Sequence, residues 1–340
     1  MRQPTRISRA QRACTWAVAG LLAGVAWTAA AAGWQPSKPV TFVVVGGPGG
    51  GADQIARLIQ GISSKYGLMK EPLVVVVENG GGGAQGLLDM KDSQGDAHKI
   101  AIALSNLYTI PMATGLPFNW RDTTPVALMA LDQFVLWVNA DTPYKTAREF
   151  LDAVKAKPGG FKMGVVGSKR EDEIVTAMLE EATGTKFIHI PYKGGGENAT
   201  QLVGKHIDAN VNNPIENVSQ WRAGQVRPLC VFDHERMPFN QPLADGKSWH
   251  DIPPCRDAGA DVRYLMLRGI FMPKGVTPEQ RDFYVEFLKK VREEPEWRDF
   301  IDRGAYKNTF MSGPEFEQFL VDDERRHHDI MQKAGFLAKP

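Results

Sequence analysis

Cysteine, excess charge and long apolar stretches are all scarce in this sequence, and each shortage excludes a class of protein. Only three of the 340 residues are cysteine, and no CxxC pair or clustered His/Cys spacing occurs, so we expect no structural zinc. The formal net charge is +1, which leaves no basic patch and argues against a nucleic-acid partner. After residue 32, no apolar run approaches the roughly 18 residues that a membrane span requires.

Recognisable catalytic motifs are missing as well. The sequence contains no G-x-S-x-G, no H-E-x-x-H, and no Ser/Cys–His–Asp arrangement with supporting context. His327 and His328 follow an acidic segment, but adjacent histidines on a helix point apart, so a solvated face is expected there. We therefore predict that the protein is not an enzyme and uses neither a metal nor a cofactor.

The N-terminus has the pattern of a cleaved signal peptide. Four arginines precede an apolar stretch, Ala13–Ala32, which ends in a run of alanines, and no acidic residue occurs before Asp53. Cys14 lies far from the expected cleavage site near Ala32, so a lipoprotein anchor is not indicated. Residues 1–32 are therefore predicted to be a signal peptide rather than a membrane anchor, with export to the periplasm. Loss of the four arginines would change the formal charge from +1 to −3.

Two cysteines remain after residue 32. In an oxidising compartment Cys230 and Cys255 could form a disulfide that closes a proline-rich loop. Alternatively, Cys230 is a buried thiol in an apolar strand and Cys255 an unrelated loop thiol. The sequence leaves both interpretations open.

A glycine run organises the rest of the chain. Val40–Val45 is β-branched and apolar, which predicts a buried strand, and Ala52–Ile59 has an apolar face of helical period. Gly46–Gly51 between them has almost no side chains, so its backbone N–H groups can approach a ligand closely. Because this loop also opens a helix, we expect it to bind a carboxylate- or phosphate-sized anion.

Three other interpretations of this glycine run were weighed. It could be a tight turn without a ligand. A P-loop is excluded, because Ala52-Asp53 stands where Lys and Ser/Thr are required. A Rossmann fingerprint is matched by Gly47–Ala52, with Glu78 closing the next apolar run, but one such match is weak evidence.

Strand and helix patterns alternate through the chain, which predicts an α/β fold with mostly parallel sheets. Val126–Val138 is expected to be one long apolar run, and 277–291 and 314–334 are expected to be long helices. The strand–glycine–helix pattern recurs at Met163–Leu179. Two such sites suit two lobes that face each other across a ligand cleft.

The chain resembles the Bug family, the periplasmic substrate-binding receptors of tripartite tricarboxylate transporters. The resemblance extends over the whole length after residue 33. Its segments, in order, are 34–40, Val45–Asp53, Val77–Gly83, Thr124–Ala130, Ile190–Gly195, Gly204–Asp208, Trp221–Gly224, Asp251–Pro254 and Met272–Pro278. An ordered series of this kind is far more specific than one glycine motif.

The resemblance implies a two-lobed, type II-like Venus-flytrap receptor. One lobe would comprise residues 33–133 and 264–340, and the other residues 134–263. Such a receptor would act as a monomer that captures a small carboxylate, such as a di- or tricarboxylate, an aromatic acid or an acidic amino acid. Its partners would be the membrane permease subunits. The family's two ligand loops map onto Gly46–Asp53 and Gly164–Lys169.

This sequence departs from the family at the predicted site. Charged residues, Lys169 to Asp172, follow the second loop, and Arg268 occupies a strand position that is often aromatic in the family. A buried arginine needs an acidic partner, which could be the ligand or an internal Asp or Glu. Ser168 is expected to cap the helix that follows. The candidate ligand-binding residues are Gly46, Gly47, Gly49, Gly50, Gly51, Asp53, Ser105, Asn106, Gly167, Ser168, Lys169, Tyr192, Asn213 and Arg268.

Several of these candidates have alternative roles, and the whole protein has alternative functions. Asp53 could brace the first loop instead of touching the ligand, and Tyr192 could simply pack its lobe. A periplasmic solute receptor is the function that the sequence favours. The alternative is an exported Rossmann-like NAD-dependent oxidoreductase, against which the signal peptide argues. A ligand module for a sensor kinase is a third and weaker option.

Overall fold

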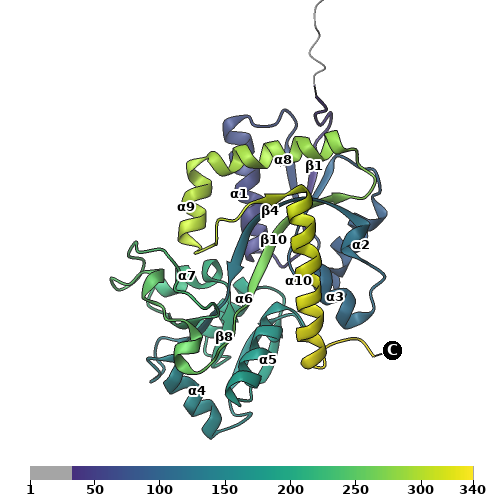
Figure 1. The fold of residues 1–340 in the computed structure, drawn as a ribbon. Helices are drawn as coiled ribbons and strands as arrows, with labels where there is room; N and C mark the ends of the chain where they lie inside the picture. Colours follow the sequence, from purple (N-terminus) through teal and green to yellow (C-terminus); the bar gives the residue numbers. More distant parts are fainter. Residues whose placement is uncertain (1–32, 340) are drawn as a thin grey trace, which may run out of the picture. The chain divides into compact units, whose positions relative to one another are not determined.

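Two β-sheets organise residues 33–339, the part of the chain that the computed structural model describes (Figure 1). The predicted signal peptide, residues 1–32, lies outside the described residues. From Gln35 onward the chain forms one compact unit. The first sheet has the strand order β11-β4-β10-β3-β1-β2, and the second has the order β7-β6-β8-β5-β9.

The first sheet takes its strands from both ends of the chain, and the second takes them from the middle. The first sheet contains β1 (Val40–Val44), β2 (Leu73–Val77), β3 (Lys99–Ala103), β4 (Thr123–Gln133), β10 (Leu265–Pro273) and β11 (Met311–Ser312). The second contains β5 (Val135–Asn139), β6 (Lys162–Val166), β7 (Ile188–Tyr192), β8 (Ala209–Asn212) and β9 (Val226–Val231).

Both sheets are mixed, so the prediction of mostly parallel sheets is wrong. In the first sheet β1 runs parallel to β2 and β3, whereas β10 is antiparallel to β3 and β4. In the second, β6 is parallel to β7 and β8, but β5 is antiparallel to β8 and β9. In the first sheet β10 and β11 run opposite to the other strands, and in the second sheet β5 runs opposite to the others.

The apolar run Val126–Val138 is not one strand. It divides at Phe134, so that β4 ends in the first sheet and β5 begins in the second. A return connection lies beside this point, because Phe232 donates its backbone N–H to the Phe134 carbonyl and Tyr264 donates to Phe232. All three aromatic side chains are buried. The chain therefore passes between the sheets through two adjacent, well-packed segments.

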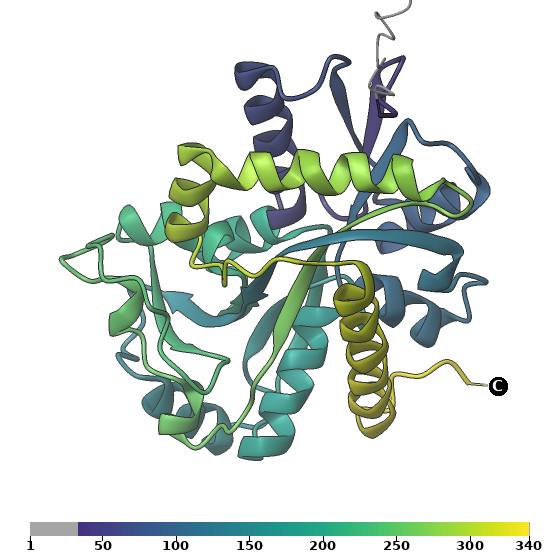
Figure 2. The same cartoon turned by 45° about the horizontal axis from the view of Figure 1, so that its top comes forward.

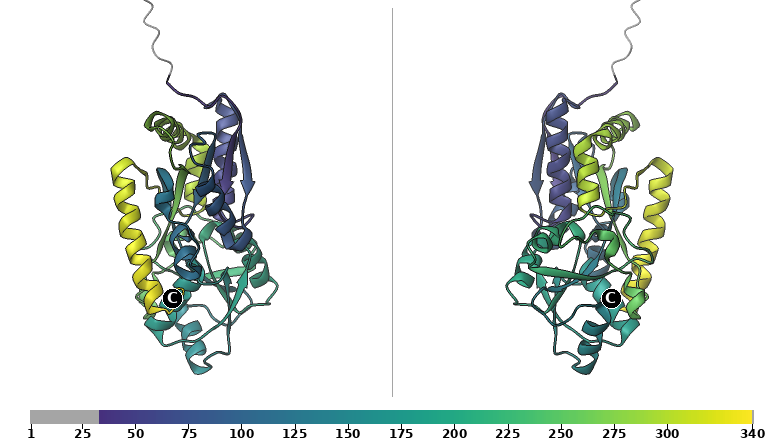
Figure 3. Two further views of the ribbon diagram at one scale, coloured as in Figure 1. Left: turned by 90° about the vertical axis from the view of Figure 1, so that its right-hand side faces the viewer. Right: turned by 90° about the vertical axis from the view of Figure 1, so that its left-hand side faces the viewer.

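Helices cover both sheets (Figures 1 and 2). Those associated with the first sheet are α1 (Gly51–Tyr66), α2 (Ala84–Asp92), α3 (Asn106–Thr114), α8 (Pro278–Glu293), α9 (Pro295–Arg303) and α10 (Gly313–Lys333). Those associated with the second are α4 (Ala147–Ala156), α5 (Glu171–Thr183), α6 (Gly195–Val203) and α7 (Pro214–Arg222). Figure 3 shows α1 and α10 toward opposite sides of the unit.

Local signals explain where several helices begin. The Thr146 and Thr277 side chains accept hydrogen bonds from the backbone three residues on, which starts α4 and α8 with capping boxes. The two long helices predicted near the C-terminus are present as α8 and α10. Helices α3, α7 and α9 were not predicted. Each contains a proline, Pro111 inside α3 and Pro214 and Pro295 at the first positions of α7 and α9.

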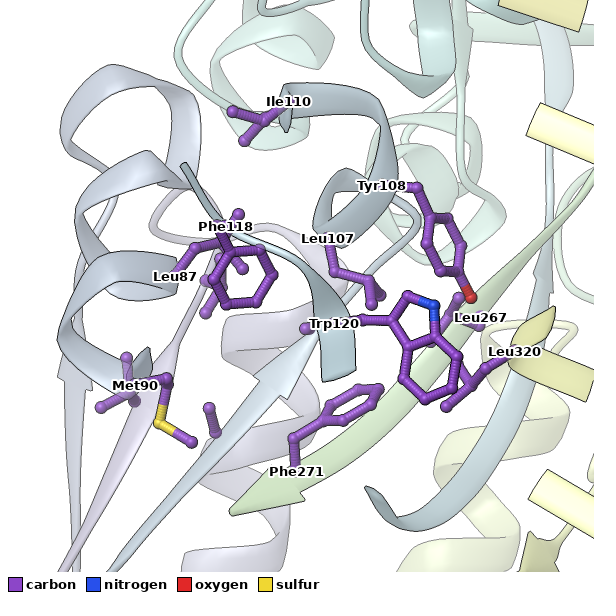
Figure 4. Close-up of a cluster of buried hydrophobic side chains, with 14 of the residues drawn as sticks. Leu87, Met90, Leu107, Tyr108, Ile110, Phe118, Trp120, Leu267, Phe271 and Leu320 are labelled. Carbon is purple, nitrogen blue, oxygen red and sulfur yellow. The ribbon is translucent and has the colours of Figure 1, made fainter. Parts of the chain in front are cut away.

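A large hydrophobic cluster lies between the first sheet and the helices α2, α3 and α10 (Figure 4). Leu87 and Met90 of α2 pack with Phe118, Trp120 and Phe271, all of them buried. Each such side chain contributes about 1.5–3 kcal/mol through its removal from water. This packing fixes the first sheet, and therefore fixes the position of the glycine loop after β1.

In the second sheet, Cys230 of β9 forms a disulfide with Cys255, which begins the short turn Cys255–Ala258. Both cysteines are fully buried. Within residues 33–339, no helix is both long and apolar enough to cross a bilayer.

Candidate functional site

A small cavity lies where the glycine loop after β1 meets elements of the second sheet. We call the elements around the first sheet the first lobe and those around the second sheet the second lobe. The first loop and the start of α1 contribute Gly46, Gly47, Gly50, Gly51 and Ala52. Strands of the two sheets contribute Val166, Met266 and Arg268, and Leu104 follows β3 directly. The second lobe contributes Arg170, Glu171, Asp172, Gly194, Gly195, Asn213 and Glu216. The cavity encloses about 30 Å³, which holds a few water molecules at most.

Four helices begin at this cavity. Gly51 starts α1, Glu171 starts α5, Gly195 starts α6, and Asn213 immediately precedes α7. The first amides of a helix have no partner inside the helix, and the helix dipole makes that end positive. Helices from both lobes therefore direct positive potential into the same small space.

The chain's own carboxylates already use part of the first glycine loop. The backbone N–H of Gly51 donates to Glu216 Oε1 at 3.1 Å, and that of Gly49 donates to Asp53 Oδ2 at 2.9 Å. Asp53 also pairs with Arg57 at 2.8 Å. Asp53 thus braces the loop, which was the structural alternative to ligand contact, and Glu216 reaches the start of α1 from the other lobe.

Three glycines allow the groups around the cavity to approach closely. A Cβ on Gly51 would lie 2.4 Å from Arg268 Nη2, and one on Gly195 would lie 2.0 Å from the Glu216 carboxylate. A Cβ on Gly47 would lie 2.4 Å from the Lys193 carbonyl oxygen, in the other lobe. Distances of this kind are below any real contact, so these positions require glycine in this arrangement.

The acidic partner of Arg268 is a residue of the chain itself, Asp132. Its Nε donates to Asp132 Oδ2 at 3.0 Å, and its Nη2 donates to Asn213 Oδ1 at 3.2 Å. Both charged side chains are almost fully buried. Burial raises the pKa of Asp132 to about 6, although Arg268 acts in the opposite direction. Arg268 therefore belongs to an ion pair at the wall of the cavity.

Two other carboxyl groups at the cavity have raised pKa values. Burial raises the pKa of Glu216 to about 7, despite the opposing effect of Arg268. Burial also raises the pKa of Asp172 well above its usual value, and the neighbouring Glu216 and Glu171 add to the shift. The cavity is thus rich in acidic groups that pay a desolvation cost when they ionise.

Of the second predicted loop, Gly164–Lys169, Val166 alone lines the cavity. Gly167, Ser168 and Lys169 do not line it, whereas the next residues, Arg170 to Asp172, do. The cap of α5 is Arg170, so the prediction that Ser168 caps this helix is wrong. Ser168 is exposed, and the Lys169 backbone donates to Glu173 Oε2 at 2.5 Å.

Of the remaining candidates, only Asn213 lies at the cavity, and its amide also donates to the Gln133 carbonyl at 2.8 Å. Asn106 is buried and donates to the Val45 carbonyl at 2.9 Å, so it ties the ends of β1 and β3 together. Ser105 is buried next to it. Tyr192 ends β7 opposite Val166 but does not itself line the cavity.

Glu216, Glu171 and Asp172 are acidic lining residues that sequence reasoning did not select, and Arg170, Gly194 and Gly195 were not selected either. The charged run after Ser168 was noticed, but acidic residues in the first turn of a helix are common and gave no reason to place them inside. Glu216 carried only the weak signal of an acid at the third helical position after Asn213. Within residues 33–339, no group of three or more His, Cys, Asp or Glu is placed to hold a metal ion.

The Rossmann alternative meets a physical obstacle at the same loop. A dinucleotide pyrophosphate needs open space beside the glycine turn. Here the backbone of Lys193 and Gly194 already lies against Gly47, and the Asn79 side chain donates to the Lys193 carbonyl at 3.1 Å. The arrangement therefore favours a site for a small ligand between lobes.

The chain is similar in sequence to known proteins. The chain is 27% identical over 338 residues to the UPF0065 protein in the gbd 5' region of Cupriavidus necator, which covers 98% of each chain. It is 27% identical over 231 residues to protein BugT of Bordetella pertussis, covering 65% of this chain and 69% of that one.

Solved structures share the fold. One described as a periplasmic transporter has a TM-score of 0.80 and 26% identity, and the match covers 89% of this chain and 99% of that one. MatC from Rhodopseudomonas palustris, with bound malate, has a TM-score of 0.74 and 20% identity, with 87% and 99% covered. The model of the tripartite tricarboxylate transporter family receptor, TctC, matches residues 55–336. The chain belongs to this TctC receptor family, to which Bug proteins are related.

Proposed function

We propose that this protein is a periplasmic receptor that captures a small carboxylate between its lobes and delivers it to the permease of a tripartite transporter. The observation that carries the proposal is the convergence of four helix N-termini, from both lobes, on one cavity. The bound malate of MatC, a protein of the same fold, supports a small acid as the ligand. The family assignment supports delivery to a membrane partner and function in the periplasm.

Binding must involve opening of the lobes. The cavity of about 30 Å³ is smaller than a dicarboxylate, and the lobes touch at Gly47 and Lys193. We place the hinge at the two crossings near Phe134 and between Phe232 and Tyr264. The strand membership of the two sheets supports lobe limits of 33–133 with 264–340, and 134–263. A ligand that contacts both lobes stabilises the closed form.

The proposal is tested by calorimetric titration of the chain from residue 33 onward with di- and tricarboxylates, aromatic acids and amino acids. We expect saturable binding of at least one acid, together with thermal stabilisation that grows with its concentration. If no acid binds and a reduced nicotinamide cofactor does, the proposal is wrong and the oxidoreductase alternative gains support.

A pair of glycine variants tests whether closure is needed. Gly47→Ala places a methyl group against Lys193 and is expected to weaken acid binding by about tenfold or more. Gly61→Ala lies in α1 with nothing within 4 Å, so it serves as the matched control and is expected to bind normally. Equal affinities of the two variants would contradict closure at Gly47.

A further inference from the structure

The carboxylate of Glu216 lies between glycines of the two lobes. Its Oε1 accepts the backbone N–H of Gly51 at 3.1 Å, and a Cβ on Gly50 would lie 3.3 Å from the same oxygen. In its own lobe, a Cβ on Gly195 would lie 2.0 Å from the carboxylate. Gly51 begins α1 and Gly195 begins α6, while Glu216 itself is in the first turn of α7. The side chain therefore occupies a position where three helix N-termini favour a negative charge.

The ligand of the proposed receptor needs this same position. Gly50, Gly51, Gly195 and Glu216 all line the cavity, which encloses only about 30 Å³. A backbone amide has a single N–H to donate, so the N–H of Gly51 serves one carboxylate at a time. Two ionised carboxylates placed side by side also repel each other. Glu216 and a ligand carboxylate are therefore alternatives at the start of α1 and not neighbours.

Asp53, the other carboxylate on the glycine loop, differs from Glu216 in this respect. Asp53 accepts the N–H of Gly49 from within its own segment and pairs with Arg57 at 2.8 Å, so it stays in place however the lobes are arranged. Glu216 reaches the loop across 165 residues and from the other lobe. Its contact is made only when the lobes meet, which is also when a ligand is enclosed. Of these two carboxylates, only Glu216 is placed to exchange with a ligand.

We propose that Glu216 is an internal competitor of the ligand. Its carboxylate occupies the place at the start of α1 that a ligand carboxylate takes, and the need to displace or neutralise it sets the affinity of the receptor for acids. This inference rests on the proposed receptor function. It assigns to Glu216 a role in tuning affinity and does not narrow the choice of acid.

The acid–base properties of the site agree with this role. Burial raises the pKa of Glu216 to about 7, so near neutral pH its carboxyl group is protonated in about half of the molecules. A neutral carboxyl group does not repel an anion, so a ligand carboxylate binds the protonated form better. Acid binding therefore takes up protons and weakens as pH rises through about 7. The other titratable groups that face Glu216 are Arg170, Glu171 and Asp172 of α5, Asp132 of β4, Arg268 of β10, and Tyr306.

Glu216→Gln tests the competition, because it removes the charge and keeps the shape of the side chain. Calorimetry at about pH 6 and about pH 8 measures the binding of malate, a dianion at both values, and of each acid that binds in the titration above. With a pKa of about 7, only about a tenth of the Glu216 side chains are neutral at pH 8. The glutamine variant is therefore expected to bind acids about tenfold more tightly than the wild type at pH 8, and about equally at pH 6.

The ratio of the two affinities at each pH isolates Glu216, since Asp132, Glu171 and Asp172 are common to both proteins. Glu149→Gln is the matched control, because Glu149 holds the same third position in α4 that Glu216 holds in α7 but lies exposed and away from the cavity. It is expected to follow the wild type at both pH values. Proton uptake on binding, measured in buffers that differ in ionisation enthalpy, should be smaller in Glu216→Gln than in the wild type.

Glu216→Ala keeps the inference falsifiable if the glutamine variant does not fold, and thermal unfolding checks the folding of both. It leaves the N–H of Gly51 without an acceptor from the other lobe, so acid binding at pH 8 is again expected to be about tenfold tighter than in the wild type. If a folded variant binds acids at pH 8 no more tightly than the wild type does, the inference is wrong while the receptor function stands. If neither the wild type nor the variants bind any acid, the receptor function fails as well.

Discussion

Glu216 of α7 accepts a hydrogen bond from the backbone N–H of Gly51 at 3.1 Å, although 165 residues separate them. The contact joins the start of α1 in one lobe to the start of α7 in the other. It places a carboxyl group where an anion is most favourable, at a helix N-terminus, yet in surroundings that raise its pKa to about 7.

This relationship predicts how stability depends on pH. The pKa of Glu216 is higher in the folded protein, so the folded state binds the proton more tightly than the unfolded state. Its contribution favours folding at low pH and is lost as pH rises from about 4.5 through about 7. Glu216→Gln removes this dependence. As pH rises from 5 to 8, we expect the free energy of unfolding of the variant to increase by roughly 1–3 kcal/mol relative to that of the wild type.

Urea unfolding at the two pH values measures this difference. Glu286→Gln, at an exposed position of α8, is the matched control and is expected to follow the wild type. If Glu216→Gln loses stability relative to the wild type as pH rises, the carboxylate is favoured in the folded state and the assignment is wrong.

The buried pair Asp132–Arg268 gives a second prediction. Asp132→Asn leaves the Arg268 guanidinium buried without a compensating charge, which is expected to cost about 3–5 kcal/mol of folding free energy. Asp141→Asn removes an exposed pair with Lys205 and serves as the control, with no measurable loss expected. Chemical denaturation compares the two, and similar effects would show that the buried pair is not required.

The strand–loop–helix at the start of the fold could be predicted from sequence, because its signals are local. β1 and α1 follow the periodicity of Val40–Val45 and Ala52–Ile59, and the glycines between them mark the turn from strand to helix. Asn213 and Arg268, two of the candidates selected from the sequence, line the cavity. The polarity of Asn213 at a strand end and the charge of Arg268 in an apolar strand were sufficient.

The acidic lining could not be predicted in the same way. Glu216 reaches the cavity only because α7 packs against the loop of the other lobe, a relationship that no local pattern encodes. Glu171 and Asp172 resemble the acidic first turn of any surface helix. The reversed course of β5 and β10 was missed for a related reason, since strand direction depends on long connections rather than on strand sequence.

His189 on β7 gives a third prediction. Its ring lies 3.3 Å from Glu173 and 3.5 Å from Glu180, and these carboxylates raise its pKa to about 9. The charged ring therefore stabilises the fold fully below about pH 6.5, and this contribution is lost as pH rises through about 9. We expect His189→Gln to cost roughly 1–2 kcal/mol near neutral pH, because the ring is partly exposed, and less at about pH 10.

Thermal denaturation at the two pH values tests this prediction, with His328→Gln, an exposed histidine of α10, as the control. NMR titration of the His189 ring provides an independent measurement. A pKa at or below the ordinary value would show that the two carboxylates do not hold the charged ring.

The disulfide gives the last prediction. It joins cysteines that are 25 residues apart, and closure of a loop of this length restricts the unfolded chain enough to contribute about 3 kcal/mol. The double variant Cys230→Ala/Cys255→Ala is expected to unfold at a lower temperature and a lower urea concentration than the oxidised wild type. A reducing agent should lower the stability of the wild type toward that of the variant and leave the variant unchanged.

Because the bridge lies in the second sheet, away from the cavity, ligand affinity at a temperature where both proteins are folded should be the same. A change in affinity without a change in stability would mean that the bridge acts on the site, which its position in the fold argues against.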